Sequence, residues 1–144
     1  MIAVAEQKMG GFSVEVELAN NDDLIRATYG LILPEQVRRA RIRGVIDTGT
    51  TRLVLPALVA QQLGLETAGA STVRYADGRT AERSIVKGVH LTYGGRESVF
   101  TAIMEIDRES ALIGAIVRED LDFLVDYIGQ RLVPRDPKQI VSEL

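Results

Sequence analysis

The chain has 144 residues, of which 46% are hydrophobic and 26% are charged, and its formal net charge is −3 at pH 7. These values are typical of one ordinary globular domain with enough apolar material for a core, and they exclude an intrinsically disordered chain. The mildly acidic balance argues against a nucleic-acid partner, because a general nucleic-acid binder carries a basic surplus.

The absence of cysteine excludes disulfides, a thiolate metal site and a thiol nucleophile. The N-terminal residues lack the basic start and the apolar segment of a signal peptide. No apolar run approaches the roughly 20 residues that span a bilayer. We therefore expect a cytoplasmic protein without a membrane partner.

The first third of the chain predicts strands. Residues 12–20 alternate polar residues with Val14, Val16 and Leu18, the period-2 pattern of a half-buried strand. Residues 20–23 (Asn-Asn-Asp-Asp) predict a turn, and residues 24–32 a returning strand. Residues 37–47 predict a further strand with Ile42 inward and its arginines outward. Residues 37–43 hold four arginines, which leaves a phosphate-binding patch as an alternative.

The pattern changes at Leu55, where Pro56 predicts the start of a helix that ends near Gly64. Residues 71–75 and 79–86 predict a hairpin, and residues 89–93 and 97–106 predict further strands. The stretch 111–134 predicts a short helix near Val117–Leu121 and a final strand. We expect one domain over residues 12–134, between an N-terminal segment (1–11) and a C-terminal arm (135–144).

Few side chains in the sequence are candidates for catalysis or for binding a metal or cofactor. His90 is the only histidine, and it shares the polar parity of its strand with Thr92, so a solvated strand face is its expected place. A Ser-His-Asp site would need His90, but no G-x-S-x-G elbow is present. The ligands for zinc are too few, and the sequence contains neither a P-loop nor a G-x-G-x-x-G motif. We therefore expect neither a metal nor a cofactor.

Asp47 is the remaining candidate for a catalytic group. It ends the apolar run Gly44–Ile46 and is followed by Thr48-Gly49-Thr50. A carboxylate is costly to bury unless it is paired or hydrogen-bonded, so its place at the end of a strand requires a reason.

The residues Val45 to Thr50 resemble the Asp-Thr-Gly signature of aspartic peptidases. Ala111-Leu112-Ile113-Gly114 resembles the second element of this family, and the hairpin tip lies between the two in the order that the family has. The resemblance covers roughly residues 12–136 and is to retropepsin-like, single-domain aspartic proteases of the bacterial type. It implies a mostly-β, closed-sheet acid-protease fold with a short C-terminal helix and one lobe per chain.

The resemblance also implies an aspartic endopeptidase. Because the chain contains one Asp-Thr-Gly, the catalytic dyad would require a homodimer that supplies Asp47 from each subunit and acts on a peptide or protein substrate. By position, Thr48 would contact the partner's loop, Gly49 would allow close backbone approach, and Thr50 would orient the carboxylate. Support of the site would come from Leu112, Ile113 and Gly114.

The resemblance places a flap over the substrate, formed by the hairpin tip Tyr75, Ala76, Asp77, Gly78 and Arg79. The substrate pockets are expected to be apolar, with Leu53, Ile85 and Ile116 as candidates.

Three alternatives stay open. The same fold is compatible with a catalytically silent peptide-binding or dimerisation module. The run Ile46-Asp47-Thr48-Gly49-Thr50-Thr51 also resembles the phosphate loop of the actin and heat-shock ATPase superfamily, although that fold is several times longer and its other motifs are missing. Finally, Asp47 is compatible with a simple turn cap in an unrelated β domain.

Overall fold

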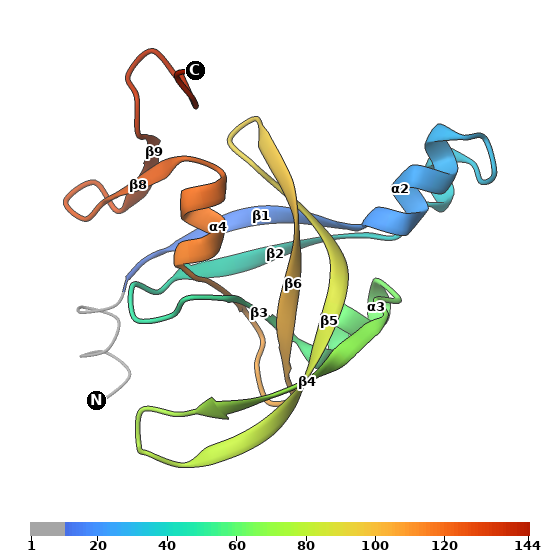
Figure 1. The fold of residues 1–144 in the computed structure, drawn as a ribbon, viewed down its shortest axis with the longest axis horizontal. Coiled ribbons are helices and arrows are strands. Elements are labelled where there is room, and N and C mark those ends of the chain that lie inside the picture. The colour runs from blue at the N-terminus through green and yellow to red at the C-terminus, as the bar shows by residue number, and fades with distance from the viewer. Residues whose placement is uncertain (1–10) are drawn as a thin grey trace.

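The computed structural model describes residues 11–144, so residues 1–10 of the expected N-terminal segment lie outside the described part. Figure 1 shows strands curving around one core, with a helix at either side. In chain order the elements are β1 (Ser13–Asn20), α2 (Asn21–Thr28), the 3-10 turn η1 (Pro34–Gln36), β2 (Arg39–Ile46), β3 (Leu53–Pro56), α3 (Ala57–Gln62), β4 (Thr67–Arg74), β5 (Thr80–Tyr93), β6 (Arg96–Glu105), β7 (Ala111–Ile113), α4 (Ala115–Asp120), β8 (Phe123–Asp126) and β9 (Arg131–Pro134).

The main sheet closes on itself. Its strand order is β1-β2-β7-β3-β6-β5-β4, and β5 also pairs with β1 in an antiparallel register that places Leu18 opposite Leu91. Strand β5 is long enough to pair with β4 along its first half and with β1 along its second half, so β4 extends beyond the ring. The expected mostly-β, closed-sheet fold with a short C-terminal helix is thereby confirmed.

The inward faces of these strands form the core. Val16 and Leu18 are each 2% exposed, as their period-2 pattern predicts, and Ile42 is buried while Arg41 and Arg43 are exposed. The strand interpretation of residues 37–47 is therefore confirmed. Arg41 forms an ion pair with Glu17 at 2.7 Å, so its charge is not available to a separate phosphate-binding patch.

Residues 24–32 do not form the predicted returning strand, and residues 20–23 do not form a simple turn. Asn20 instead caps α2, because its side chain accepts a hydrogen bond from the Asp23 amide at 3.0 Å. Asp23 is 3% exposed and accepts hydrogen bonds from the backbone amide and the guanidinium of Arg38. Helix capping and this ion pair override the β-prone composition of the segment.

Two further strand predictions change in detail. The helix expected from Leu55 begins at Ala57, since Leu53–Pro56 forms the short, fully buried strand β3. The segments predicted as separate strands form one continuous strand, Thr80–Tyr93, with a bulge between Val86 and Val89 where Gly88 adopts a φ of +71°. None of the helices in residues 11–144 is long and apolar enough to cross a membrane.

The C-terminal part forms α4 and a hairpin, β8–β9, in place of the single final strand that the sequence predicts. Arg96 fastens this junction by donating from Nη1 to the carbonyl oxygens of Leu121 and Asp122, at 2.8 and 2.7 Å. Its guanidinium also stacks over the Phe123 ring at 4.9 Å. Residues 135–144 contain no helix or strand.

The buried Asp23 carboxylate predicts an acid-dependent loss of stability. Its hydrogen bonds from Arg38 lower the pKa of Asp23 from 3.8 to about 2. Because the folded-state pKa is depressed, the stabilisation is present above pH 4 and is lost as the pH falls from about 4 to about 2. Arg38 is 45% exposed, so screening reduces the gain to roughly 1–2 kcal/mol. We expect Asp23→Asn to lower the free energy of unfolding by this amount at pH 7, measured by urea denaturation.

Asp22→Asn provides the matched control, since Asp22 occupies the same helical turn but is exposed. A deficit of Asp23→Asn that persists unchanged at pH 2 would contradict the ion-pair explanation.

Candidate active site

The loop that follows β2 holds the carboxylate of Asp47 in a fixed orientation. Its Oδ1 accepts a hydrogen bond from the Gly49 amide at 2.9 Å, and its Oδ2 accepts one from the Thr50 hydroxyl at 2.8 Å. The Thr50 amide also donates to the Asp47 carbonyl at 3.2 Å, which closes the turn. Thr48 and Gly49 are exposed, and Asp47 is partly exposed. The carboxylate is therefore oriented by its own loop and remains open to solvent.

Strand β7 lies directly beside the strand that delivers Asp47. In parallel register Val45 pairs with Leu112 and Ile46 with Ile113. Strand β3, on the far side of the loop, pairs with β7 in antiparallel register and places Leu53 opposite Ile113. Leu112 and Ile113 thus pair with the strands at both ends of the 47–52 loop.

Gly114 sits so close to this loop that no other residue fits. A β-carbon at Gly114 would collide with the backbone of Thr51 and with the carbonyl oxygen of Arg52. Next to it, the amides of Ala115 and Ile116 donate to the carbonyls of Thr50 and Thr51, at 3.0 and 2.9 Å. The segment Thr50–Arg52 and the first turn of α4 are therefore held together as one unit.

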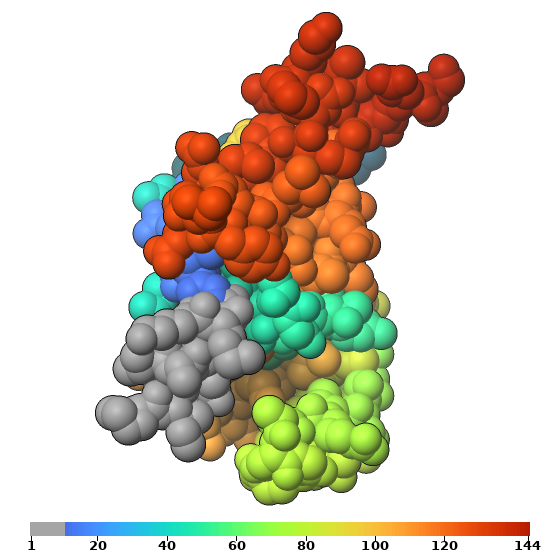
Figure 2. All heavy atoms as spheres, turned by 90° about the vertical axis from the view of Figure 1, so that its left-hand side faces the viewer, coloured from blue at the N-terminus to red at the C-terminus, as the bar shows by residue number. Residues whose placement is uncertain are grey.

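The expected flap residues form the turn between β4 and β5. The Tyr75 amide donates to the Arg79 carbonyl at 2.8 Å, and Gly78 adopts a φ of +88°, which a residue with a side chain rarely adopts. Asp77 accepts hydrogen bonds from the amide and the Nε of Arg79, and these lower the pKa of Asp77. Figure 2 shows this hairpin (green) below the loop that follows β2 (teal), with a recess between them.

A cleft of about 280 Å³ lies between the hairpin and the loop that follows β6. Glu105 occupies its wall and accepts hydrogen bonds from the Tyr75 hydroxyl and from Arg83 Nε, each at 2.6 Å. The hydrogen bond to Glu105 raises the pKa of Tyr75. The lining residues are Tyr75, Arg79, Arg83, Glu105, Ile106, Asp107 and Arg108.

This lining departs from the apolar pockets that the sequence predicts. Leu53 is wrong as a pocket residue, because it is 1% exposed and belongs to the core. Ile85 is partly buried on β5, and Ile116 is 43% exposed on α4. The sequence analysis did not identify three of these lining residues, Glu105, Asp107 and Arg108. No motif includes them, and only the fold brings them beside the hairpin.

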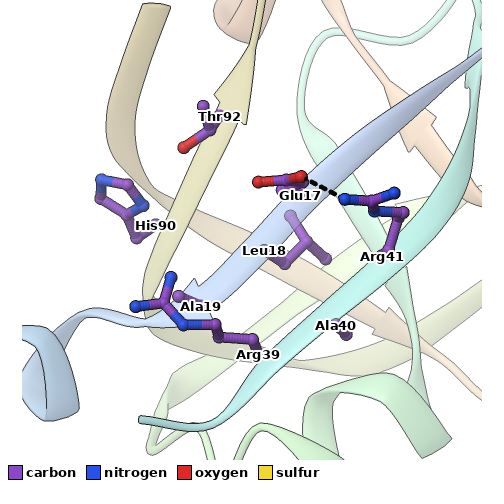
Figure 3. A pocket seen from close by; sticks show the side chains of 8 residues that line it. All are labelled: Glu17, Leu18, Ala19, Arg39, Ala40, Arg41, His90 and Thr92. Carbon is purple, nitrogen blue, oxygen red and sulfur yellow. Dashed lines mark hydrogen bonds and ion pairs between the residues drawn. The ribbon is translucent and has the colours of Figure 1, made fainter. Parts of the chain in front are cut away.

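A second hollow, of about 250 Å³, lies outside the barrel where β1 meets β2 and β5 (Figure 3). Its charged residues include Glu17 and Arg41, which pair with each other, and Arg39. His90 lines it and contacts Glu97 at 3.2 Å, with its side chain 16% exposed. The hollow lies at the start of β2, whereas Asp47 follows the end of that strand, so the two places are separate.

Within residues 11–144 the structure contains no group of three or more histidine or acidic side chains arranged to hold a metal ion.

Comparison with protein families gives a match to the aspartyl protease model over residues 35–125. The chain belongs to this family. The matched region contains β2, the Asp47 loop, the β4–β5 hairpin and β7. It begins after α2, so the helix that the sequence interpretation missed lies outside the region that defines the family.

The fold resembles that of retroviral proteases. The structure of EIAV protease in complex with an inhibitor aligns with a TM-score of 0.55 at 16% identity, covering 85% of this chain and 92% of that one. Simian foamy virus (mac) protease aligns with a TM-score of 0.48 at 10% identity, covering 74% of this chain and 91% of that one. The comparison with curated proteins gave no match.

The packing of Gly114 predicts a large difference between two glycine substitutions. Gly114→Ala forces a methyl group into the loop backbone, so we expect it to lower the free energy of unfolding by about 1–3 kcal/mol. Gly49→Ala places its methyl group 3.4 Å from Asp47 Oδ1 and meets no other neighbour within 4 Å, so its effect should stay within about 0.5 kcal/mol. Urea denaturation of both variants measures the difference. Equal effects would contradict the assigned packing.

Proposed function

We propose that this protein is an aspartic endopeptidase that hydrolyses peptide bonds as a homodimer, with Asp47 from each of two subunits forming the catalytic dyad. The observation that carries the proposal is the Asp47 carboxylate, which both Gly49 and Thr50 orient at the end of a barrel strand in an aspartyl protease fold. The chain has one such loop, and a dyad needs two carboxylates.

The chemistry of a paired site follows from electrostatics. Two carboxylates about 4 Å apart repel by roughly 4 kcal/mol at an effective dielectric constant near 20. This equals a pKa difference of about three, so one member of the pair stays protonated well above the ordinary aspartate range. The ionised member then takes a proton from a water molecule, while the protonated member donates to the peptide carbonyl. No covalent intermediate, metal or cofactor enters this scheme.

The neighbouring residues would divide the remaining work. Thr50 is a positioning residue, because its hydroxyl fixes Oδ2 of Asp47. The exposed Thr48 and Gly49 would contact the second subunit or the substrate. The Tyr75–Arg79 turn would close over a bound peptide and exclude water. In this proposal the enzyme acts on peptides in the cytoplasm, without a nucleic-acid or membrane partner.

A catalytically silent peptide-binding module of the same fold is the alternative that the structure favours next. Support for the enzyme over the module comes from the match to the aspartyl protease family, because the local hydrogen bonds to Asp47 would also form in a loop that only binds peptides. The phosphate-loop interpretation loses its support, since the loop belongs to a closed barrel with the aspartyl protease fold.

Asp47→Asn tests the proposal. The amide keeps the size of the carboxylate but cannot take the proton from water, so we expect cleavage to fall by at least about a thousandfold. The wild type and the variant are incubated with a complex peptide mixture from pH 4 to pH 8, and the products are identified by mass spectrometry.

Sedimentation analysis of the same preparations gives the control, because both proteins should form the same dimer and unfold at the same temperature. Cuts that persist in Asp47→Asn would refute the assigned role of Asp47. A wild-type dimer that binds peptides without cutting them would favour the silent module.

A further inference from the structure

We propose that Arg108 makes the cleft beside the hairpin a subsite for an acidic substrate side chain next to the scissile bond. This inference rests on the proposed peptidase function and extends it to the class of substrate. It starts from the charges that line the cleft and from the partners that each of them has.

Most of the charged groups at the cleft are already paired. Glu105 is fully engaged, since one carboxylate oxygen accepts from Tyr75 and the other from Arg83. Arg79 forms an ion pair with Asp77 at 2.7 Å and stacks over the Tyr75 ring at 5.2 Å. The contacts of Glu105 hold the base of the hairpin against the end of β6, and Arg79 and Arg83 each already have a carboxylate partner.

Arg108 differs from the other arginines of the cleft. Its Nε donates to the Ser110 carbonyl at 2.7 Å and its Nη2 contacts the Ser110 hydroxyl at 3.3 Å, and both acceptors are neutral. Among residues 11–144 no carboxylate lies within ion-pair distance of Arg108. The Ser110 contacts fix the side chain from one side and leave Nη1 free to donate.

The environment of Arg108 favours an anion. The side chain is half-buried at the cleft wall, and burial lowers the pKa of its guanidinium. The negative charges of Glu105 and Asp47 act in the opposite direction but do not outweigh burial. A partly buried charge without a direct ion-pair partner is costly, and a substrate carboxylate would offset this cost with a charge-assisted hydrogen bond.

The location of Arg108 places this contact in the path of a bound peptide. Arg108 lies in the loop that leads from β6 to β7, and the opposite wall of the cleft is the hairpin that contains Tyr75 and Arg79. The same hairpin faces the loop that follows β2 across the recess in Figure 2. A peptide that the hairpin covers beside the Asp47 loop would therefore pass the guanidinium close to the bond to be cut.

Asp107, the neighbour of Arg108, supports the opposite preference, because it is exposed and also lines the cleft. An exposed carboxylate is well solvated, so a basic substrate residue gains less from it than an acidic residue gains from a half-buried guanidinium. The structure thus favours acidic over basic substrates at this subsite.

The test compares peptides that differ only in one Glu, Gln or Lys at each of the three positions on either side of the scissile bond found in the mass-spectrometric profile. We expect kcat/KM to favour Glu by about tenfold at one position, as befits one charge-assisted hydrogen bond. Arg108→Gln should reduce this preference to within about twofold, and Arg108→Glu should invert it in favour of Lys. Arg43→Gln, which removes an exposed arginine of β2 away from the cleft, should retain the full preference.

Binding of the same peptides to Asp47→Asn, measured by calorimetry, separates this inference from the proposed function. Cleavage without a Glu preference, or with a preference that survives Arg108→Gln, would overturn the subsite and leave the peptidase intact. A wild type that does not cut, but binds Glu peptides more tightly than Gln peptides through Arg108, would support the subsite and refute the peptidase. Neither cleavage nor selective binding would overturn both.

Discussion

The contact between Gly114 and the backbone of residues 51–52 is the constraint on which the rest of the site depends. It accompanies the place of β7 between β2 and β3, where the strand entering the Asp47 loop and the strand leaving it both pair with Leu112 and Ile113. A loop tied at both ends in this way loses little entropy when it orders a side chain. The two hydrogen bonds that Asp47 accepts within its own loop therefore set a defined geometry for the carboxylate.

Charge pairing organises the other side of the cleft. Glu105 ends β6, where it accepts hydrogen bonds from a tyrosine of the turn after β4 and an arginine of β5. Each pair is partly exposed, so its contribution to stability is small, but together they fix the angle at which the hairpin leaves the barrel. Arg108, which has no ion pair among residues 11–144, differs from Arg79 and Arg83 of the same cleft, which each have one.

The sequence was informative wherever one residue's neighbours along the chain decided its structure. Alternation of Val16 and Leu18 predicted their burial, and the glycine of Ala76-Asp77-Gly78 predicted the hairpin turn. The strand predicted for residues 24–32 was wrong, because the helix that forms there depends on the contact of Asp23 with Arg38, 15 residues later. Strand β3 was missed because four consecutive buried residues show no periodicity.

The candidate site likewise contains one part that the sequence could identify and one part that it could not. Asp47 and its loop were recognisable because all the partners of the carboxylate lie within three residues of it. The charged cleft was not, since Tyr75 and Glu105 are 30 residues apart and only the closure of the barrel joins them. Apolar pockets were expected because the candidate lining residues are aliphatic, yet one of them, Leu53, is buried in the core. In a domain of this size, the core takes much of the aliphatic material, and the surface of a cleft is left to charged residues.

The surroundings of Gly49 bear on contacts with a second subunit or a substrate. Its backbone does not adopt a left-handed conformation, and apart from Asp47 nothing in the described chain lies within 4 Å of where a β-carbon would be. The packing of the described residues thus gives no reason for glycine at a position whose neighbours, Asp47 and Thr50, are tightly specified. In the proposed peptidase, a second copy of the loop and a bound peptide both approach this exposed face. A glycine leaves room for that approach, because it carries no β-carbon.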